Sequence, residues 1–237
     1  MRASAAAPYV LMYHSVDHYE ADPYHITVTP ERFAAQMAWL AGRGLRGVSV
    51  RELLLAQYTR RARRLVGLTF DDGYADFVTQ AVPIMRRHGF TATVFVVAGK
   101  IGGVNDWDPD GPRKPLMTAE DLRWAVAEGM EVGSHTVTHA VLASADPYDV
   151  ERELKTSRVL LEEIVQRQVE GLAYPYGAID ENAVDAARAA GYSYACAIKP
   201  PAADQHTLPR TYIGQRDGLL RLYAKRARHR WKWRRGR

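Results

Sequence analysis

Residues 65–73 read LVGLTFDDG, a short apolar stretch that ends in two carboxylates and a glycine. Its length and its Leu, Val and Phe content are typical of a buried strand. Asp71 and Asp72 then fall at the carboxyl end of that strand, where adjacent carboxylates are costly unless a cation or hydrogen-bond donors compensate them. Taken alone, Asp-Asp-Gly is equally typical of a turn or a helix start, so the rest of the chain decides the interpretation.

Further apolar runs alternate with helical patterns along the chain. The predicted strands span residues 9–13, 92–97, 130–133, 172–173, 192–198 and 208–213. Helix starts are marked by N-cap residues or early prolines, at Thr29-Pro30, Ser49, Thr118 and Asp146-Pro147. This alternation predicts a parallel sheet covered by helices. In an α/β barrel the strand ends share one rim, where active sites lie, although an open doubly wound sheet would gather the same loops.

The length and composition fit one domain. The chain has 237 residues, of which 47% are hydrophobic and 25% charged, and its sequence shows no internal repeat or linker. We expect residues 1–216 to form the barrel domain and residues 217–237 a basic, tryptophan-containing tail. Cys196 is the single cysteine, which excludes an internal disulfide; in its apolar surroundings it is typical of core packing rather than of a nucleophile.

A pair of histidines, His135 and His139, follows the strand predicted at 130–133. Histidines four residues apart are often a solvated helix face, but on a helix or tight turn they can bind one ion from the same side. Two imidazoles and one carboxylate form a facial set that leaves coordination positions open for water and substrate. Since both clusters follow short strands, the sequence predicts a hydrolytic metal site in which a second carboxylate accepts the proton.

Three motifs resemble those of the polysaccharide deacetylases, which share the NodB-homology fold. They are residues 69–73 (TFDDG), 134–139 (SHTVTH) and 174–177 (YPYG), in the family's order, and the resemblance extends over residues 9–210. It implies an α/β fold, a distorted (β/α) barrel of about seven strands. It also implies a general base, Asp71, and three ligands of a divalent metal, Asp72, His135 and His139. Zinc is the expected metal, with cobalt, nickel or iron as alternatives.

Two departures from the family pattern set the remaining catalytic assignments. The family's third motif has an arginine two places before its proline, where this chain has Ala173; Arg210 could reach the base from another strand or lie at the surface. The C-terminal Leu-x-His motif that supplies the acid is missing. The first strand instead ends Leu-Met-Tyr-His, as in the subgroup resembling biofilm poly-N-acetylglucosamine deacetylases. We therefore expect His14 to protonate the leaving amine, with His206 as its competitor.

The resemblance implies hydrolysis of N-acetyl groups of an amino-sugar polysaccharide, oligosaccharide or lipid-linked sugar, which releases acetate. The backbone N–H of Tyr176 would help to bind the oxyanion, and its side chain suits stacking or packing. Trp107, in a loop at 99–115, could stack on a sugar ring, and Tyr174 and Pro175 are further candidates for substrate contact. Two alternatives are an O-acetyl esterase on acetylated polysaccharide and a carbohydrate-binding member of the fold with low activity. An intact Asp71 argues against a pure binder, which needs no base.

The positive charge is concentrated at the carboxyl end. Residues 221–237 hold nine Lys or Arg and no acid, so this segment carries +9 against +5 for the whole chain, which leaves −4 for the rest. Such a run is commonly a solvated terminal helix, but with Trp231 and Trp233 it also suits an anionic membrane surface. The acidic remainder argues against nucleic acid as a partner.

The amino-terminal sequence bears on localisation. The alanine-rich run at 3–7 ends at Pro8 before the apolar region of a secretory leader could form, and no apolar run has the length of a membrane span. We therefore expect a cytoplasmic protein that is bound to membranes, if at all, peripherally.

Overall fold

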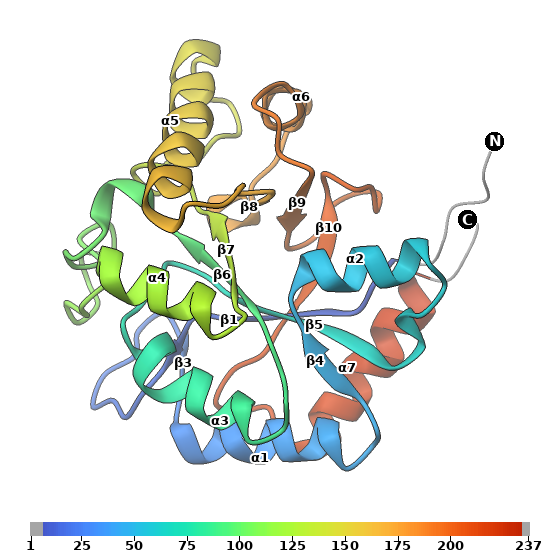
Figure 1. The fold of residues 1–237 in the computed structure, drawn as a ribbon. Coiled ribbons are helices and arrows are strands. Elements are labelled where there is room, and N and C mark those ends of the chain that lie inside the picture. Colours follow the sequence, from blue (N-terminus) through green and yellow to red (C-terminus); the bar gives the residue numbers. More distant parts are fainter. Residues whose placement is uncertain (1–6, 234–237) are drawn as a thin grey trace.

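A closed parallel β-barrel lies at the centre of the structure, a computed structural model (Figure 1). Around the barrel the strands follow in the order β1 (Val10–Tyr13), β10 (Leu208–Tyr212), β9 (Tyr194–Ala197), β8 (Gly171–Ala173), β7 (Glu131–Ser134), β6 (Thr93–Val96) and β5 (Leu65–Phe70). Parallel pairing of β1 with β5, from Val10 opposite Gly67 to Tyr13 opposite Phe70, closes the circle. The predicted (β/α) barrel of about seven strands is confirmed.

The structure describes residues 7–233. Residues 1–6, which hold most of the alanine-rich run, and residues 234–237, the end of the predicted basic tail, lie outside the described residues. No helix within the described range combines the length and the apolarity needed to cross a bilayer.

One extra strand distorts the barrel. β4 (Arg46–Val48) pairs with the first half of β5, with Arg46 opposite Leu65, whereas β6 pairs with the second half, with Thr69 opposite Thr93. β4 was not predicted, because its three residues follow a glycine-rich helix end and are too few to show a pattern. A small parallel pair, β2 (Ser15–Val16) and β3 (Thr27–Val28), was not predicted either.

Helices cover the outside of the barrel. They are α1 (Pro30–Ala41), α2 (Val50–Tyr58), α3 (Val82–Arg86), α4 (Ala119–Ala127), α5 (Pro147–Val165), α6 (Glu181–Ala189) and α7 (Leu219–Lys232). The predicted caps are confirmed: the side chains of Thr29, Ser49, Thr118 and Asp146 each accept a backbone N–H of the first helical turn. The helical segment after Asp76 begins as a π-helix, Phe77–Ala81, and continues as α3. Pro83, which has no N–H to donate, stands at this change of helix type.

Side chains alternate between two cores along each strand. On β6, Val94 and Val96 pack outward beneath the helices, whereas Phe95 points into the barrel together with Ala173 and Cys196. Val50 and Leu53 of α2 belong to this inner cluster, so α2 closes the amino-terminal end of the barrel. The opposite, carboxyl-terminal end is therefore the end at which a site can open to solvent.

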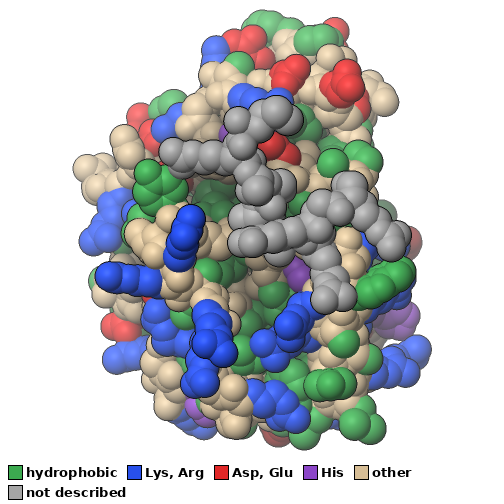
Figure 2. Space-filling view, turned by 90° about the vertical axis from the view of Figure 1, so that its right-hand side faces the viewer, with side chains coloured by type: hydrophobic (Ala, Val, Ile, Leu, Met, Phe, Trp, Pro, Cys, Tyr) green, Lys and Arg blue, Asp and Glu red, His purple; other side chains and the backbone are tan. Residues whose placement is uncertain are grey.

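The carboxyl ends of the strands point to the left in Figure 1, toward the loop at 99–117, and the start of β1 and the end of α7 lie on the right. α7 runs back along the barrel toward the right-hand end. Its Leu222 and His229 are buried, and the His229 ring lies 4.9 Å from that of Tyr9, just before β1. Figure 2 shows the right-hand face, where Lys and Arg side chains gather in the lower half and Asp and Glu toward the top.

Candidate active site

Three ligand-type side chains meet at the carboxyl-terminal rim. Asp72 follows β5, His135 follows β7, and His139 ends the turn after it; all three are buried. The Nε2 atoms of both histidines lie 3.4 Å from Oδ1 of Asp72, and one ligand atom from each residue lies within 4.8 Å of the others. Among the described residues, this Oδ1 atom has no hydrogen-bond partner although it is buried. A buried carboxylate oxygen without a hydrogen-bond donor fits a bound cation.

The protonation state of His135 suits metal binding. Its Nδ1 lies 2.7 Å from the carbonyl oxygen of Ala173, which can only accept, so the proton is on Nδ1 and the lone pair of Nε2 faces Asp72. Burial, opposed by the neighbouring carboxylates, lowers the pKa of His135 to about 4. For Asp72, burial alone would raise the pKa, but the His139, His14 and His135 imidazoles hold it well below its usual range. A neutral imidazole and an ionised carboxylate are the ligand forms that a cation requires.

The backbone is unusual at each of the three motifs. Asp72, Thr136, His139 and Tyr176 all have positive φ angles, between 57° and 73°, which non-glycine residues rarely adopt. Such conformations cost free energy and persist where the surrounding structure imposes them, often at functional sites. The turn that carries the two histidines is not a helix. Positive φ angles at Thr136 and His139 bring both imidazoles to one side.

Glu153 fixes this turn, and the sequence analysis did not identify it. Its Oε2 accepts the N–H groups of Val137 and Thr138 at 2.7 and 3.0 Å, and its Oε1 accepts the Thr138 hydroxyl at 2.9 Å. Glu153 lies on α5 beside Val150 and Leu154 and is buried. A glutamate on the apolar face of an otherwise amphipathic helix was the available signal.

Asp71, the second carboxylate of the pair, contacts an arginine rather than the histidine group. Arg210 of β10 donates from Nη1 to Oδ1 at 2.5 Å and from Nη2 to Oδ2 at 2.8 Å, and both side chains are buried. Burial alone would raise the pKa of Asp71, but the Arg210 guanidinium and nearby imidazoles hold it below its usual value. The guanidinium lies over the Phe95 ring at 5.5 Å, inside the barrel, where Ala173 leaves room.

His14 and His206 lie in different places. His14 follows β1, and its Nε2 is 4.0 Å from Oδ2 of Asp71, on the rim. The ring of His206 hydrogen-bonds through Nε2 to the carbonyl of Tyr192 at 2.8 Å. Of these two histidines, His14 is therefore the one that lies beside the carboxylate pair.

Two aromatic side chains of the rim pack on His139. The Trp107 ring stacks on it with centroids 4.8 Å apart, and the Tyr176 ring meets it edge-on at 4.7 Å. Tyr176 is 56% exposed and available to a substrate, whereas Tyr174 and Pro175 are buried. The Tyr174 hydroxyl donates to the carbonyl of His206, so its ring offers no surface for the substrate contact that the sequence suggested.

A buried ion pair joins the loop at 99–117 to the segment after His14. Asp76 accepts the Ser15 hydroxyl at 2.6 Å and the N–H of Val16 at 2.9 Å, and Nζ of Lys114 lies 3.3 Å from it. This pair fixes the chain on both sides of the rim opening. The sequence gives no signal for it, since Asp76 and Lys114 are 38 positions apart in unrelated segments.

The closed barrel of seven parallel strands places this fold in the class of NodB-type (β/α) barrels. The polysaccharide deacetylase family profile matches residues 59–195, more than half of the chain, so the chain belongs to that family. The sequence resemblance is thereby confirmed.

Two relatives and two solved structures give the scale of the similarity. Bacillus subtilis YxkH, named as a polysaccharide deacetylase on a provisional basis, is 29% identical over 83% of this chain and 66% of its own length. A Staphylococcus aureus poly-beta-1,6-N-acetyl-D-glucosamine N-deacetylase is 22% identical over 79% of this chain and 68% of its own. The chain thus spans about two thirds of each relative.

Similar folds occur in Streptococcus pyogenes deacetylase PplD in complex with acetate and in IcaB from Ammonifex degensii. The TM-scores are 0.79 and 0.75. PplD is 23% identical, and the match covers 94% of this chain and 99% of that chain. IcaB is 22% identical, and the match covers 93% of this chain and 97% of that chain. At this level of identity the likeness establishes the fold.

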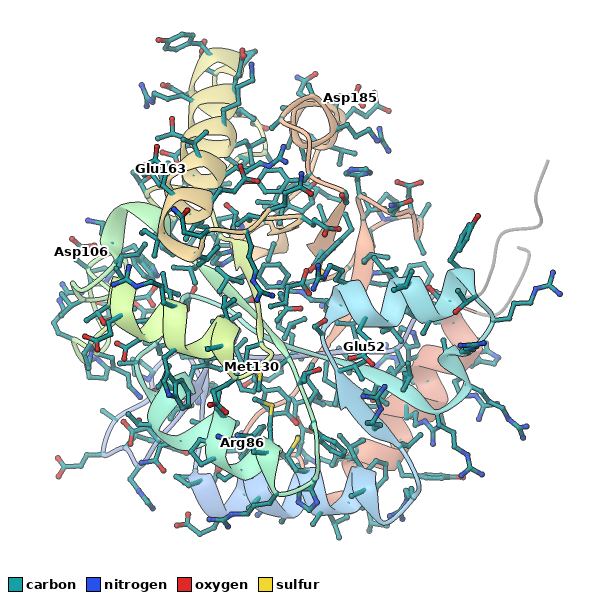
Figure 3. All side chains as sticks on the ribbon, in the orientation of Figure 1. Glu52, Arg86, Asp106, Met130, Glu163 and Asp185 are labelled. Carbon is teal, nitrogen blue, oxygen red and sulfur yellow. The ribbon has the colours of Figure 1, made fainter. Side chains whose placement is uncertain are left out.

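Replacing Glu153 tests its hold on the histidine turn. Glu153→Ala should weaken zinc affinity by about 10- to 100-fold, because the turn loses the acceptors that orient both imidazoles. Chelator competition measures the affinity. Glu163→Ala is the matched control, since Glu163 is an exposed glutamate on the same helix (labelled in Figure 3). Equal affinities in Glu153→Ala and the unmodified protein would contradict the role of Glu153.

Removing Arg210 tests the pairing with Asp71. Arg210→Met should lower the free energy of unfolding by about 3–5 kcal/mol, since it leaves a buried carboxylate uncompensated. Urea titration in the presence of a chelator measures this without a metal contribution. The double variant Asp71→Asn/Arg210→Met should recover at least half of the loss, because no charge is then stranded. Strictly additive losses would show that the two side chains do not interact as described.

Proposed function

We propose that the protein is a metal-dependent deacetylase that hydrolyses the N-acetyl groups of an amino-sugar glycan and releases acetate. The observation that carries this proposal is the pairing of two adjacent carboxylates in different surroundings. Asp72 lies 3.4 Å from two imidazoles, with a buried oxygen that lacks a hydrogen-bond partner among the described residues. Asp71 is held by Arg210 at 2.5 and 2.8 Å. Asp72 can thus bind a cation, and Asp71, oriented by Arg210, can accept a proton.

The residues present fit a divalent cation. Asp72, His135 and His139 would hold it, and their mixed oxygen and nitrogen donors suit zinc, with cobalt, nickel or iron as alternatives. When bound, such a cation polarises the acetyl carbonyl and lowers the pKa of water. Trp107 and Tyr176, which pack on His139, limit how that imidazole can rotate.

Asp71 acts as the general base in this proposal. Its lowered pKa keeps it ionised at neutral pH, so it can accept the proton of the attacking water. Arg210 holds both carboxylate oxygens and thereby fixes the direction in which Asp71 faces the rim. The backbone N–H of Tyr176, in its positive-φ turn, is the proposed donor to the developing oxyanion.

His14 acts as the general acid and protonates the amine nitrogen as the C–N bond breaks. It lies 4.0 Å from Asp71 and is only partly exposed, with 17% of its side-chain surface accessible. An amine is a poor leaving group unless it is protonated, whereas an activated ester leaves without a proton. Dependence on His14 therefore separates cleavage of an amide from cleavage of an activated ester.

The proposed partners are an acetylated glycan at the rim and an anionic membrane surface at the basic carboxyl-terminal segment. Trp107 and the exposed Tyr176 ring offer the aromatic surface on which a sugar can pack. The described part of the basic segment is α7, which packs on the barrel through Leu222 and His229.

Histidine replacement tests the acid. His14→Ala should lower acetate release from an N-acetylated chitooligosaccharide by about 10²- to 10⁴-fold. The same variant should hydrolyse 4-nitrophenyl acetate within about tenfold of the unmodified rate, because nitrophenolate needs no proton. His206→Ala is the control and should leave both rates nearly unchanged. Loss of activity in His206→Ala with retention in His14→Ala would reverse the assignment.

Acetate release from three substrates tests the function itself. We expect release from poly-N-acetylglucosamine or chitooligosaccharides, and none from the same substrates with Asp71→Asn. Release from acetylxylan alone would make the protein an O-acetyl esterase. Binding of glycan without release of acetate would make it a carbohydrate-binding member of the fold.

A further inference from the structure

The amino-terminal end of the barrel carries a second group of arginines, far in sequence from α7. Residues 59–64 read TRRARR, and Arg60, Arg61, Arg63 and Arg64 are all exposed. No ion pair forms on any of these four among the described residues. Since β5 begins at Leu65, they lie immediately before the strand, at the end of the barrel opposite Asp71 and Asp72.

The last turns of α7 reach the same end. The Tyr9 carbonyl accepts the N–H of Gly67 at 2.9 Å, and the Tyr9 ring contacts His229 of α7. Tyr9 therefore lies between the start of β5 and the end of α7. We define the basic face as eight residues from these two segments: Arg60, Arg61, Arg63, Arg64, Arg226, Arg228, Arg230 and Lys232. The start of β5 and the last turns of α7 lie on the right in Figure 1, on the side that Figure 2 shows.

Apolar side chains project into solvent beside the basic face. Tyr58, at the end of α2, is 79% exposed, Trp231 is 70% exposed and Leu55 is 63% exposed. Neither residues 59–64 nor α7 contains an acidic residue. Cations interspersed with exposed Tyr, Trp and Leu match the interface of an anionic bilayer, where the charges meet headgroups and the rings enter the boundary layer. A purely electrostatic partner such as nucleic acid would not require the exposed leucine.

We propose that the amino-terminal end of the barrel is a docking surface for an anionic lipid bilayer, formed jointly by residues 55–64 and the end of α7. Docking there holds the catalytic rim away from the lipid. The six residues of β5 separate the two ends by about 20 Å, at roughly 3.3 Å per residue. Asp106, on the rim loop, lies at the left edge of Figure 3, whereas the end of α7 lies on the right.

This orientation rests on the proposed function, which identifies the rim as the catalytic end, and it bears on the substrate. A sugar linked directly to lipid would lie against the bilayer, on the wrong side of a docked enzyme. A glycan chain that extends away from the bilayer would reach the rim. The structure thus favours a polymer or oligosaccharide substrate over the lipid-linked sugar.

Vesicle co-sedimentation tests the surface without reference to activity. The full chain should bind vesicles that contain 30% phosphatidylglycerol, and binding should vanish on pure phosphatidylcholine. Raising the salt from 0.1 to 1 M should weaken binding strongly, since the screening length falls from about 10 Å to about 3 Å. Failure to bind the anionic vesicles would overturn the proposal, and tighter binding to duplex DNA or heparin than to vesicles would assign the face to an acidic polymer instead.

Charge-matched variants locate the surface. Replacing either Arg60, Arg61, Arg63 and Arg64, or Arg226, Arg228, Arg230 and Lys232, by Gln should lower the partition coefficient by roughly a thousandfold, at about 1 kcal/mol for each charge. The control removes four charges from α4, α5 and α6, at Arg123, Arg152, Lys155 and Arg188, and should retain most of the binding. A loss restricted to the α7 variant would overturn the two-segment face, and an equal loss in the control would show an effect of net charge alone.

A fluorophore at two engineered cysteines tests the orientation. Cys196 is buried, so a polarity-sensitive label will react with Tyr58→Cys or Asp106→Cys. Vesicles should shift the emission of the label at position 58 to the blue and leave position 106 unchanged. A shift at 106 would overturn the orientation even if acetate release confirms the proposed function, so the two can fail independently.

Discussion

The structure of the rim depends on one buried carboxylate. The Oδ1 atom of Asp72 lies 3.4 Å from the Nε2 atoms of His135 and His139, and it has no hydrogen-bond partner among the described residues. Leaving a buried charge in that state is costly, and the strained backbone at Asp72 and His139 adds to the cost. The surrounding structure holds the arrangement through Glu153 on one side and the carbonyl of Ala173 on the other. A divalent cation would offset these costs, because it supplies the positive charge that the site lacks.

The adjacent Asp71 differs from Asp72 because of a single residue, Arg210. The family pattern places an arginine at the position of Ala173, on β8, whereas here the guanidinium comes from β10 and crosses the barrel interior above Phe95. The inward-facing residues of a closed barrel converge on a common axis, so a long side chain can reach the same point from different strands. In this chain residue 173 is a small alanine, and the arginine that pairs with Asp71 is Arg210. Asp71 keeps a bidentate partner although the motif has changed.

Much of this could be predicted from the sequence, for identifiable physical reasons. The strand at 65–70 and the caps at Thr29, Ser49, Thr118 and Asp146 are local signals, and the structure has them where the sequence indicated. The convergence of Asp72, His135 and His139 followed from the shared direction of parallel strands. The roles of Glu153 and of the Asp76–Lys114 pair were not predicted, because they depend on how distant segments pack against each other. The sequence also left open whether Arg210 contacts Asp71 or lies at the surface, because the answer depends on how the strands close into a barrel.

The central claim is that Asp72, His135 and His139 bind one divalent cation. Anomalous diffraction from crystals grown with zinc, recorded on both sides of the zinc absorption edge, tests it most directly. The account predicts a single strong peak about 2.0–2.2 Å from a carboxylate oxygen of Asp72 and from Nε2 of both histidines. A map without a peak among these three side chains, or with zinc bound only elsewhere on the protein, would contradict it.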